Sequence, residues 1–327
     1  MYFLIGISLV FAYLYAMNVG ASLVSAAAWE LAAKYTRRLS RRGRADLLFL
    51  LRVMPLAAAL VLSLALLVPS FLLFEPHESD EIVSYKLGIV VAISLLGVTA
   101  AGGRIFASWW RTRRLTAAWL NEAEAFELPG SGLPAFRIEH PFPVLAVIGV
   151  LRPKIFVASQ VLETLSPSEL HAALSHEIGH ITSRDNLKRM AMRLCRDMLV
   201  VPLGQNLDAA WLEAAESAAD EFAATDDRNA LDLASALVKI SRITPRGFAW
   251  EMPAGAYLTE PNDTSLAGRV ADLVDLAGKE PDAVRFTTAL IQAAPLLILA
   301  VLLLPAFSEK ALYSVHRMTE IVIANLQ

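Results

Sequence analysis

The sequence predicts a mainly α-helical, polytopic membrane protein with about four transmembrane helices and one water-soluble α+β domain. Of the 327 residues, 56% are apolar and 19% are charged, whereas soluble domains contain roughly 45–50% apolar and 25% charged residues. The apolar excess is concentrated in four stretches without any charged residue, namely 1–29, 53–74, 87–103 and 286–308. The rest of the chain has a soluble composition. A purely soluble enzyme, a disordered protein and a coiled coil are therefore excluded.

Three of these stretches exceed the length that a membrane-spanning helix requires, which is about 20 apolar residues for a hydrocarbon core of roughly 30 Å. The stretch 87–103 lies at the lower limit, and a buried core helix is its alternative. The stretch 1–29 could instead be a signal peptide cleaved near residues 25–28. It has no basic amino-terminal region, however, and its apolar part is too long for one. We therefore expect a retained transmembrane helix there.

Basic residues beside the apolar stretches predict the orientation, because loops rich in Lys and Arg stay in the cytoplasm. They are concentrated before the second stretch and after the third, whereas the loop 75–86 is acidic. We therefore expect a multi-pass protein of the inner (cytoplasmic) membrane with its N-terminus outside and three spans within residues 1–103. Residues 104–285 would form a cytoplasmic domain, 286–308 a fourth span and 309–327 a short external tail. The basic residues concerned are Lys34, Arg37, Arg38, Arg41, Arg42, Arg44, Arg104, Arg111, Arg113 and Arg114.

The net charge predicts which partners the protein binds, and the cysteine content predicts the redox state of its compartment. The net charge is −3, and the basic residues are explained by topology and by contact with anionic lipids. The lipid bilayer is therefore an expected partner, and direct nucleic-acid binding is not expected. The single cysteine, Cys195, allows no internal disulfide and fits a reducing compartment.

One motif in the soluble segment, His176-Glu177-Ile178-Gly179-His180, carries metal chemistry. Positions i and i+4 share one face of a helix, so both imidazoles can reach a single Zn²⁺ ion. Glu177, beside the first ligand, can then act as general base toward water. Ser166 as N-cap, followed by a proline and by Glu169 in a capping box, predicts the start of this helix. The alternative is a pair of surface histidines on an amphipathic helix.

A catalytic zinc site needs a third protein ligand. The segment 211–224 reads as a second helix, on which Glu216 and Asp220 lie four residues apart and share a face. We expect Glu216 to be the third ligand, with Glu213 as its competitor, and Asp220 to accept the other N–H of a ligand histidine. Asp185 either orients a histidine or caps the first helix. A solvated acidic helix face is the alternative for the whole group.

Other parts of the domain are less informative. The candidates for oxyanion or substrate contacts are His140, Tyr257 and Arg269, and none has a spacing argument. His140 could simply lie in a loop, and Arg269 could equally cap a helix or pair with an acid. The segment 154–159 is either a strand that binds extended substrates or a strand packed beneath the helix. Further strands are expected within 136–157, helices at 169–182, 208–224 and 230–241, and a loop at 249–263.

Three motifs together resemble the BlaR/MecR-type integral-membrane zinc metallopeptidases: residues 176–180, Ser183-Arg184-Asp185-Asn186 and Glu216-Ser217-Ala218-Ala219-Asp220, preceded by the strand-like segment 149–157. The resemblance implies a zincin-type (gluzincin) metallopeptidase domain that holds one Zn²⁺ per chain through His176, His180 and Glu216. It also implies a protein or peptide substrate, with a DNA-binding repressor and self-cleavage as candidates. Family members that sense β-lactams continue into a penicillin-binding domain after the fourth span, whereas 19 residues follow Ser308 in this sequence. We therefore expect the resemblance to cover the protease and its topology and not antibiotic sensing.

The expected function is thus that of a membrane-embedded, zinc-dependent endopeptidase that cleaves a cytoplasmic or membrane-associated protein in signal transduction. An HtpX-like quality-control protease is the alternative, although the charged interval 181–212 contains no run long enough to cross a bilayer. A site-2-type intramembrane protease is rejected because the motif helix is flanked by charged residues. A metal-bound scaffold without catalysis is the remaining alternative.

Overall fold

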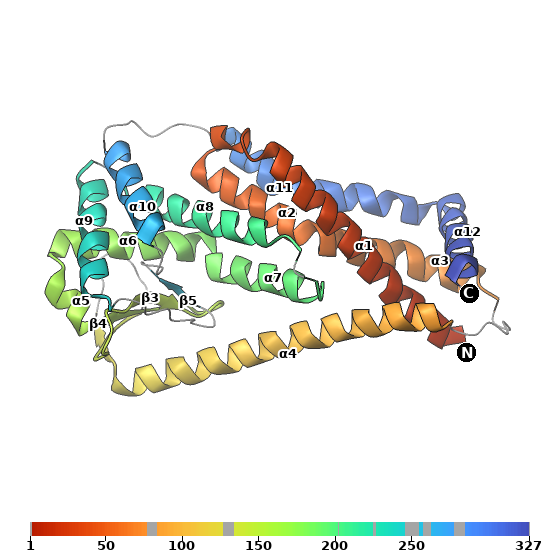
Figure 1. Ribbon diagram of the computed structural model, residues 1–327, viewed down its shortest axis with the longest axis horizontal. Helices are drawn as coiled ribbons and strands as arrows, with labels where there is room; N and C mark the ends of the chain where they lie inside the picture. Colours follow the sequence, from red (N-terminus) through yellow and green to blue (C-terminus); the bar gives the residue numbers. More distant parts are fainter. Residues whose placement is uncertain are drawn as a thin grey trace. The chain divides into compact units, whose positions relative to one another are not determined.

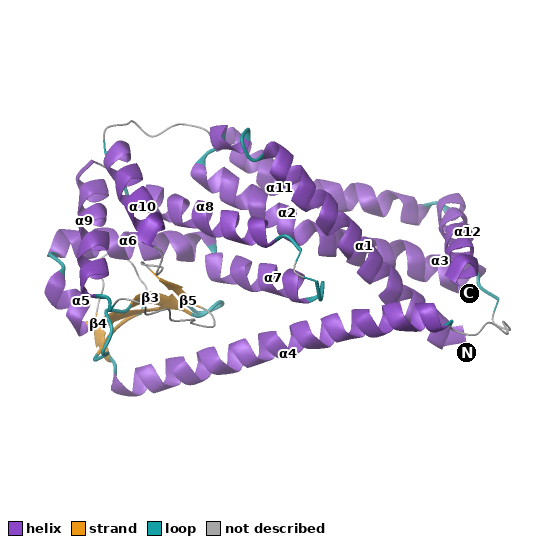
Figure 2. Ribbon diagram, viewed as in Figure 1, coloured by secondary structure: helices purple, strands orange, loops and turns teal. Residues whose placement is uncertain are grey.

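The computed structural model describes residues 2–76, 84–126, 134–201, 203–224, 227–245, 255–257, 263–277 and 285–326. The chain divides into two compact units. The first unit comprises Met1–Gly103, Ala191–Trp211 and Val284–Gln327, and the second comprises Arg104–Met190 and Leu212–Ala283. The prediction of a mainly helical chain is confirmed, and Figure 2 shows the few strands gathered in one small sheet.

The first unit contains the long apolar helices (Figure 1). Among the described residues, three helical segments are long and apolar enough to cross a membrane, namely Tyr2–Ala32, Arg41–Phe74 and Tyr85–Glu122. A fourth candidate is a pair of helices, Ile291–Phe307 and Glu309–Ala324, which are bent by 90° relative to each other. The count of about four spans therefore holds if this bent pair is one span. The elements are α1 (Tyr2–Ala32), α2 (Arg41–Leu62), α3 (Val68–Phe74), α4 (Tyr85–Glu122), α11 (Arg285–Leu303) and α12 (Glu309–Leu326).

The third apolar stretch is not a buried core helix. It is the first part of α4, and only 17% of its most apolar window is buried within the protein. Large side chains such as Ile89 and Leu96 are more than half exposed. A charge-free apolar segment whose side chains are largely exposed fits a membrane-spanning helix. The segment 309–327, expected to be a short external tail, forms helix α12 over Glu309–Leu326.

A helical irregularity joins α2 to α3. Residues Ser63–Leu67 form a π-helical turn immediately before Pro69. Proline has no backbone N–H, so a proline inside a helix leaves one backbone hydrogen bond unmade. The wider π-helical turn accommodates this loss. The turn allows one continuous apolar segment to extend from α2 to the last residue of α3, Phe74.

The second unit is built on a five-stranded sheet with the order β1-β2-β4-β3-β5. Neighbouring strands are antiparallel except for β2 and β4, which are parallel. The strands expected within 136–157 correspond to β2, β3 and β4, whereas β1 and β5 were not expected. The strands are β1 (Glu124–Phe126), β2 (Ala135–Ile138), β3 (Leu145–Ile148), β4 (Lys154–Ala158) and β5 (Gly255–Tyr257).

The expectation that residues 154–159 bind substrate as an exposed strand is wrong. These residues form β4, which is paired on one side with β2 and on the other with β3. Both backbone edges of β4 are therefore used within the sheet. The side chains of Ile155, Phe156 and Val157 are fully buried in the core. The packing alternative is the correct one.

The helices of the second unit surround this core. Helix α6 packs against β3 and against α9, and α9 packs against α10 (Figure 1). The capping box expected at the start of α6 is present, since Ser166 accepts from the backbone N–H of Glu169 and the Glu169 carboxylate accepts from that of Ser166. The helices that lie wholly in this unit are α5 (Ser159–Thr164), α6 (Pro167–Ser183), α9 (Asp227–Ile243) and α10 (Asp263–Leu276). Helices α7 (Asp185–Asp197) and α8 (Gln205–Ala223) each contain residues of both units.

Candidate metal centre

Helix α6 carries both histidines of the motif on one buried face. His176 is 0% exposed and His180 is 2% exposed, which contradicts the alternative of two surface histidines. The C-cap residue of α6 is Arg184, whose φ of 55° lies in the left-handed region. This turn ends α6 and starts α7 at once, so that Asp185 faces back toward His180.

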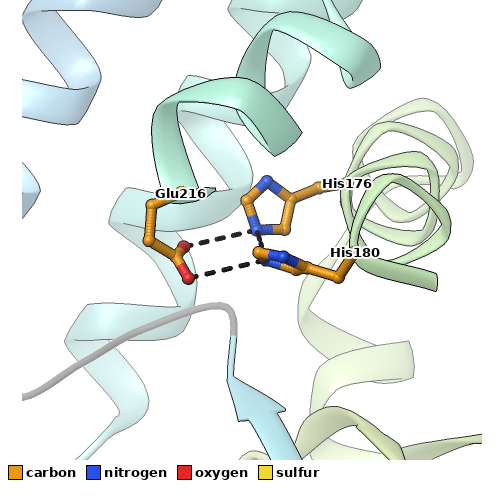
Figure 3. A group of neighbouring side chains, drawn as sticks. All are labelled: His176, His180 and Glu216. Atoms are coloured by element: carbon orange, nitrogen blue, oxygen red, sulfur yellow. Dashed lines mark hydrogen bonds and ion pairs between the residues drawn. The ribbon is translucent and has the colours of Figure 1, made fainter. Parts of the chain in front are cut away.

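Helix α8 brings Glu216 to the same point (Figure 3). The Nε2 atoms of His176 and His180 lie 3.1 Å apart. Each of them lies 3.5 Å from a carboxylate oxygen of Glu216. A tetrahedral zinc ion with bonds of about 2.0–2.1 Å places its ligand atoms about 3.4 Å apart. His176, His180 and Glu216 therefore form a candidate metal site.

The outer nitrogen of each histidine lies against an aspartate. His176 Nδ1 lies 2.8 Å from Oδ1 of Asp220 on α8, and His180 Nδ1 lies 2.8 Å from Oδ2 of Asp185 on α7. An aspartate in this place favours the proton on Nδ1, which leaves the Nε2 lone pair free. Both lone pairs then face Glu216 at close range. A cation between the three donors makes this arrangement favourable, so the residues fit a zinc ion.

Arg269 on α10 places a positive charge beside the carboxylates of Glu216 and Asp220. Its guanidinium donates two hydrogen bonds to Asp220, at 2.9 and 2.6 Å, and its Nη1 lies 3.2 Å from Glu216. Of the roles open to Arg269 in the sequence, the structure shows pairing with acids. Burial opposes ionisation of Glu216, but His180, Arg269 and His176 hold its pKa well below the usual range.

Glu177, which lies between the two histidines in the motif, is 0% exposed. Burial raises its pKa to about 8, although His180 and the backbone N–H of Val147 act in the other direction. Val147 belongs to β3, so β3, rather than the interior strand β4, is the strand next to Glu177. Asn186 ties α7 to the same strand by donating to the carbonyl oxygens of Val147 and Gly149.

Gly179, inside the motif, allows α6 and α8 to approach closely. A Cβ atom at this position would lie 3.3 Å from the backbone Cα of Ala219 and 3.2 Å from the ring of Phe222. Both neighbours are on α8, the helix that carries Glu216 and Asp220. The absence of a side chain at Gly179 therefore helps to set the distance between the histidines and their acidic partners.

The remaining candidates lie elsewhere. Glu213 is exposed, so Glu216 is the carboxylate that faces the histidines. The contacts described for His140 are with Trp119, Phe142 and Gln160 rather than with the site. Tyr257 lies in β5 opposite Ala146, and its side chain lies outside the described residues. Most of the expected loop at 249–263 also lies outside them. The pairing of β5 with β3 was missed, because three residues flanked by Gly and Pro give no strand pattern.

The comparisons with known proteins agree with this geometry. Residues 110–243 match peptidase family M48. Peptidases of family M48 depend on a metal, typically zinc. The match includes His176, His180, Glu216 and Asp220 but ends before Arg269. Together with the apolar helices, it supports a membrane-associated metallopeptidase. The match does not confirm the BlaR/MecR type specifically. No curated protein and no solved structure matches the chain.

Proposed function

We propose that the protein is a membrane-embedded, zinc-dependent endopeptidase in which His176, His180 and Glu216 hold the metal and Glu177 is the general base. The observation that carries this proposal is the convergence of two Nε2 atoms and a carboxylate at 3.1–3.5 Å. Asp220 and Asp185 fix the ring orientation of the two histidines. Zinc, when bound by such a set, lowers the pKa of a water molecule to about 7 and polarises the substrate carbonyl.

Two further side chains, Glu177 and Arg269, have roles in the proposed mechanism. Glu177 is held at a fixed place by its burial between α6 and β3. In its ionised form it accepts the proton of the attacking water, and it returns this proton to the leaving amine. A cation in the site favours ionised Glu177, because opposite charge lowers the pKa of a carboxyl. Arg269 keeps Glu216 and Asp220 charged, so both stay available to the metal and to His176.

The substrate class follows from the proposed topology. With the second unit in the cytoplasm, the peptidase acts on a cytoplasmic or membrane-associated protein. A dedicated cut in a regulator, such as a DNA-binding repressor, is the role that we propose. Four candidate spans offer the physical connection between a signal at the membrane and this cut.

The test compares membranes that contain the wild-type protein with membranes that contain Glu177→Gln, each with and without a zinc chelator, followed by mapping of new peptide N-termini. Glutamine preserves the size of the side chain and removes the base. We expect fragments only with the wild-type protein and without chelator, while both proteins bind one zinc at the His176 site. Cleavage confined to one or a few sites supports a dedicated cut. Broad digestion of misfolded membrane proteins contradicts it and favours quality control.

Two outcomes would overturn the enzymatic proposal itself. Identical peptide maps for the wild-type protein and Glu177→Gln, with zinc bound to both, would indicate a scaffold without catalysis. Failure of the wild-type protein to bind zinc would show that the ligand assignment is wrong. His176→Ala serves as the matched variant for the second case, because it removes one ligand and leaves the base in place.

A further inference from the structure

A second group of metal-ligating side chains lies in the first unit, where α12 meets the end of α3. It consists of Glu75, His316 and Glu320, whose nearest nitrogen and oxygen atoms all lie within 4.8 Å of one another. Glu75 is the C-cap residue directly after α3, and the other two residues belong to α12. All three residues lie outside the second unit, which contains the candidate peptidase site.

The group repeats the pattern of the candidate metal centre. His316 and Glu320 are four residues apart on one helix and share a face, as His176 and His180 do. A carboxylate from another helix, Glu75, supplies the third donor. Nδ1 of His316 lies 3.8 Å from Oε2 of Glu75, which is too long for a hydrogen bond. It is close to the 3.5 Å between His176 and Glu216.

The group is partly buried, because Glu75 is a buried residue and His316 and Glu320 are of intermediate burial. Glu75 is 7% exposed, and Oε1 of Glu320 is buried with no hydrogen-bond partner among the described residues. Phe74 stands beside the group, with its ring centroid 6.0 Å from that of His316. Glu75 and Glu320 bring two carboxylates to one imidazole at this place. A divalent ion would occupy the buried oxygen of Glu320.

The backbone around the group is held in place on both sides of His316. The hydroxyl of Ser70 on α3 donates to the carbonyl oxygen of Leu312 at 2.9 Å. Tyr13 on α1 shares a hydrogen bond of 3.2 Å with Thr319. Leu312 precedes His316 by one turn of α12, and Thr319 follows it by nearly one turn. The three donors are thus preorganised, and binding of an ion needs only a small inward movement of the side chains.

We propose that Glu75, His316 and Glu320 form a second transition-metal site, which binds Zn²⁺ and ties α12 to the end of α3. One imidazole and two carboxylates suit zinc, whereas calcium and magnesium prefer oxygen donors alone. The site is independent of catalysis, since none of its residues belongs to the candidate peptidase site. In the proposed topology it lies on the outer side of the membrane.

The test counts zinc in the full-length protein purified in detergent, stripped with a chelator, reloaded with Zn²⁺ and freed of excess ion by gel filtration. We expect two zinc ions per chain in the wild-type protein and in Glu177→Gln. We expect one in His176→Ala, one in Glu320→Gln and none when both of these substitutions are combined. Glu309→Gln, which changes an exposed acid on the same helix, is the matched control and should keep two.

Cobalt provides a second readout for the same proposal. In the His176→Ala background, Co²⁺ bound by His316 and two carboxylates gives visible d–d absorption, which Glu320→Gln should abolish. A wild-type protein that binds one zinc, or Glu320→Gln protein that still binds two, would overturn the proposal. His176→Ala protein that still binds two zinc ions, while Glu320→Gln protein binds one, would contradict the peptidase proposal alone. The two failures are therefore distinguishable.

Discussion

Arg269 on α10 donates two hydrogen bonds to the carboxylate of Asp220 on α8, from Nε to Oδ2 at 2.9 Å and from Nη2 to Oδ1 at 2.6 Å. The same Oδ1 lies 2.8 Å from His176 Nδ1. An arginine fork of this kind fixes the plane of a carboxylate. Asp220 therefore presents a fixed oxygen to the histidine, and the orientation of His176 depends on a residue 93 positions farther along the chain.

Arg269→Gln should weaken metal binding, although Arg269 is not itself a proposed metal ligand. The substitution leaves Asp220 without its fork and Glu216 without the cation at 3.2 Å. Loss of groups that orient metal ligands typically costs 10–100-fold in metal affinity. Zinc titration with a competing chelator measures the change. Arg269→Lys, which retains charge but not the fork, should recover only part of the loss. Full affinity in Arg269→Gln would contradict a positioning role.

Gly179→Ala should separate α6 from α8 by a few tenths of an ångström. The added methyl meets the backbone of Ala219 at 3.3 Å, and backbone yields less readily than a side-chain end. We expect weaker zinc binding and lower peptidase activity, together with a destabilisation of about 1–3 kcal/mol typical of overpacking. Gly268→Ala, at an open position with no atom within 4 Å, is the control. Equal behaviour of the two variants would refute the argument.

The metal-free protein should lose stability as the pH rises between about 4.5 and 8. Burial raises the pKa of Glu177 from its ordinary value of 4.5 to about 8 in the folded state. The folded state therefore binds more protons than the unfolded state in this window, so the free energy of unfolding falls with increasing pH. Glu177→Gln removes the titrating group. Thermal unfolding of both chelated proteins across this range should show a difference that grows with pH, and a constant difference would argue against it.

Glu169 should make the protein less stable as the pH falls in the acid range. Burial alone would raise its pKa, but hydrogen bonds from Lys239, Ser235 and Ser166 lower it to about 2. The stabilisation is complete above the ordinary pKa of 4.5 and is lost as the pH falls toward 2. Lys239→Met should therefore destabilise the protein at pH 7, by about 1 kcal/mol because Lys239 is partly exposed. The effect should shrink below pH 4. A pH-independent effect would point to lost packing instead.

Local patterns in the sequence predicted the parts of the structure that depend on near neighbours. The capping box at Ser166 and Glu169 and the sharing of one face by His176 and His180 follow from helix geometry alone. Charge-free stretches likewise predicted the apolar helices. The order of the strands could not be predicted, because β4 lies between β2 and β3, and pairing partners depend on the whole sheet. For this reason the sequence left two alternatives open for residues 154–159, and only the sheet order shows that the strand is an interior one.

The sequence by itself determined which residues are able to bind a metal, because residue type and i,i+4 spacing on a helix are properties of a short segment. Only the tertiary structure decided which donors meet. It brought Glu216 rather than Glu213 to the histidines and made Arg269 a partner of Asp220. It also joined Glu75 to His316, which are 241 residues apart. These relationships arise from the packing of distant helices, and no local periodicity encodes the distance between side chains on separate helices.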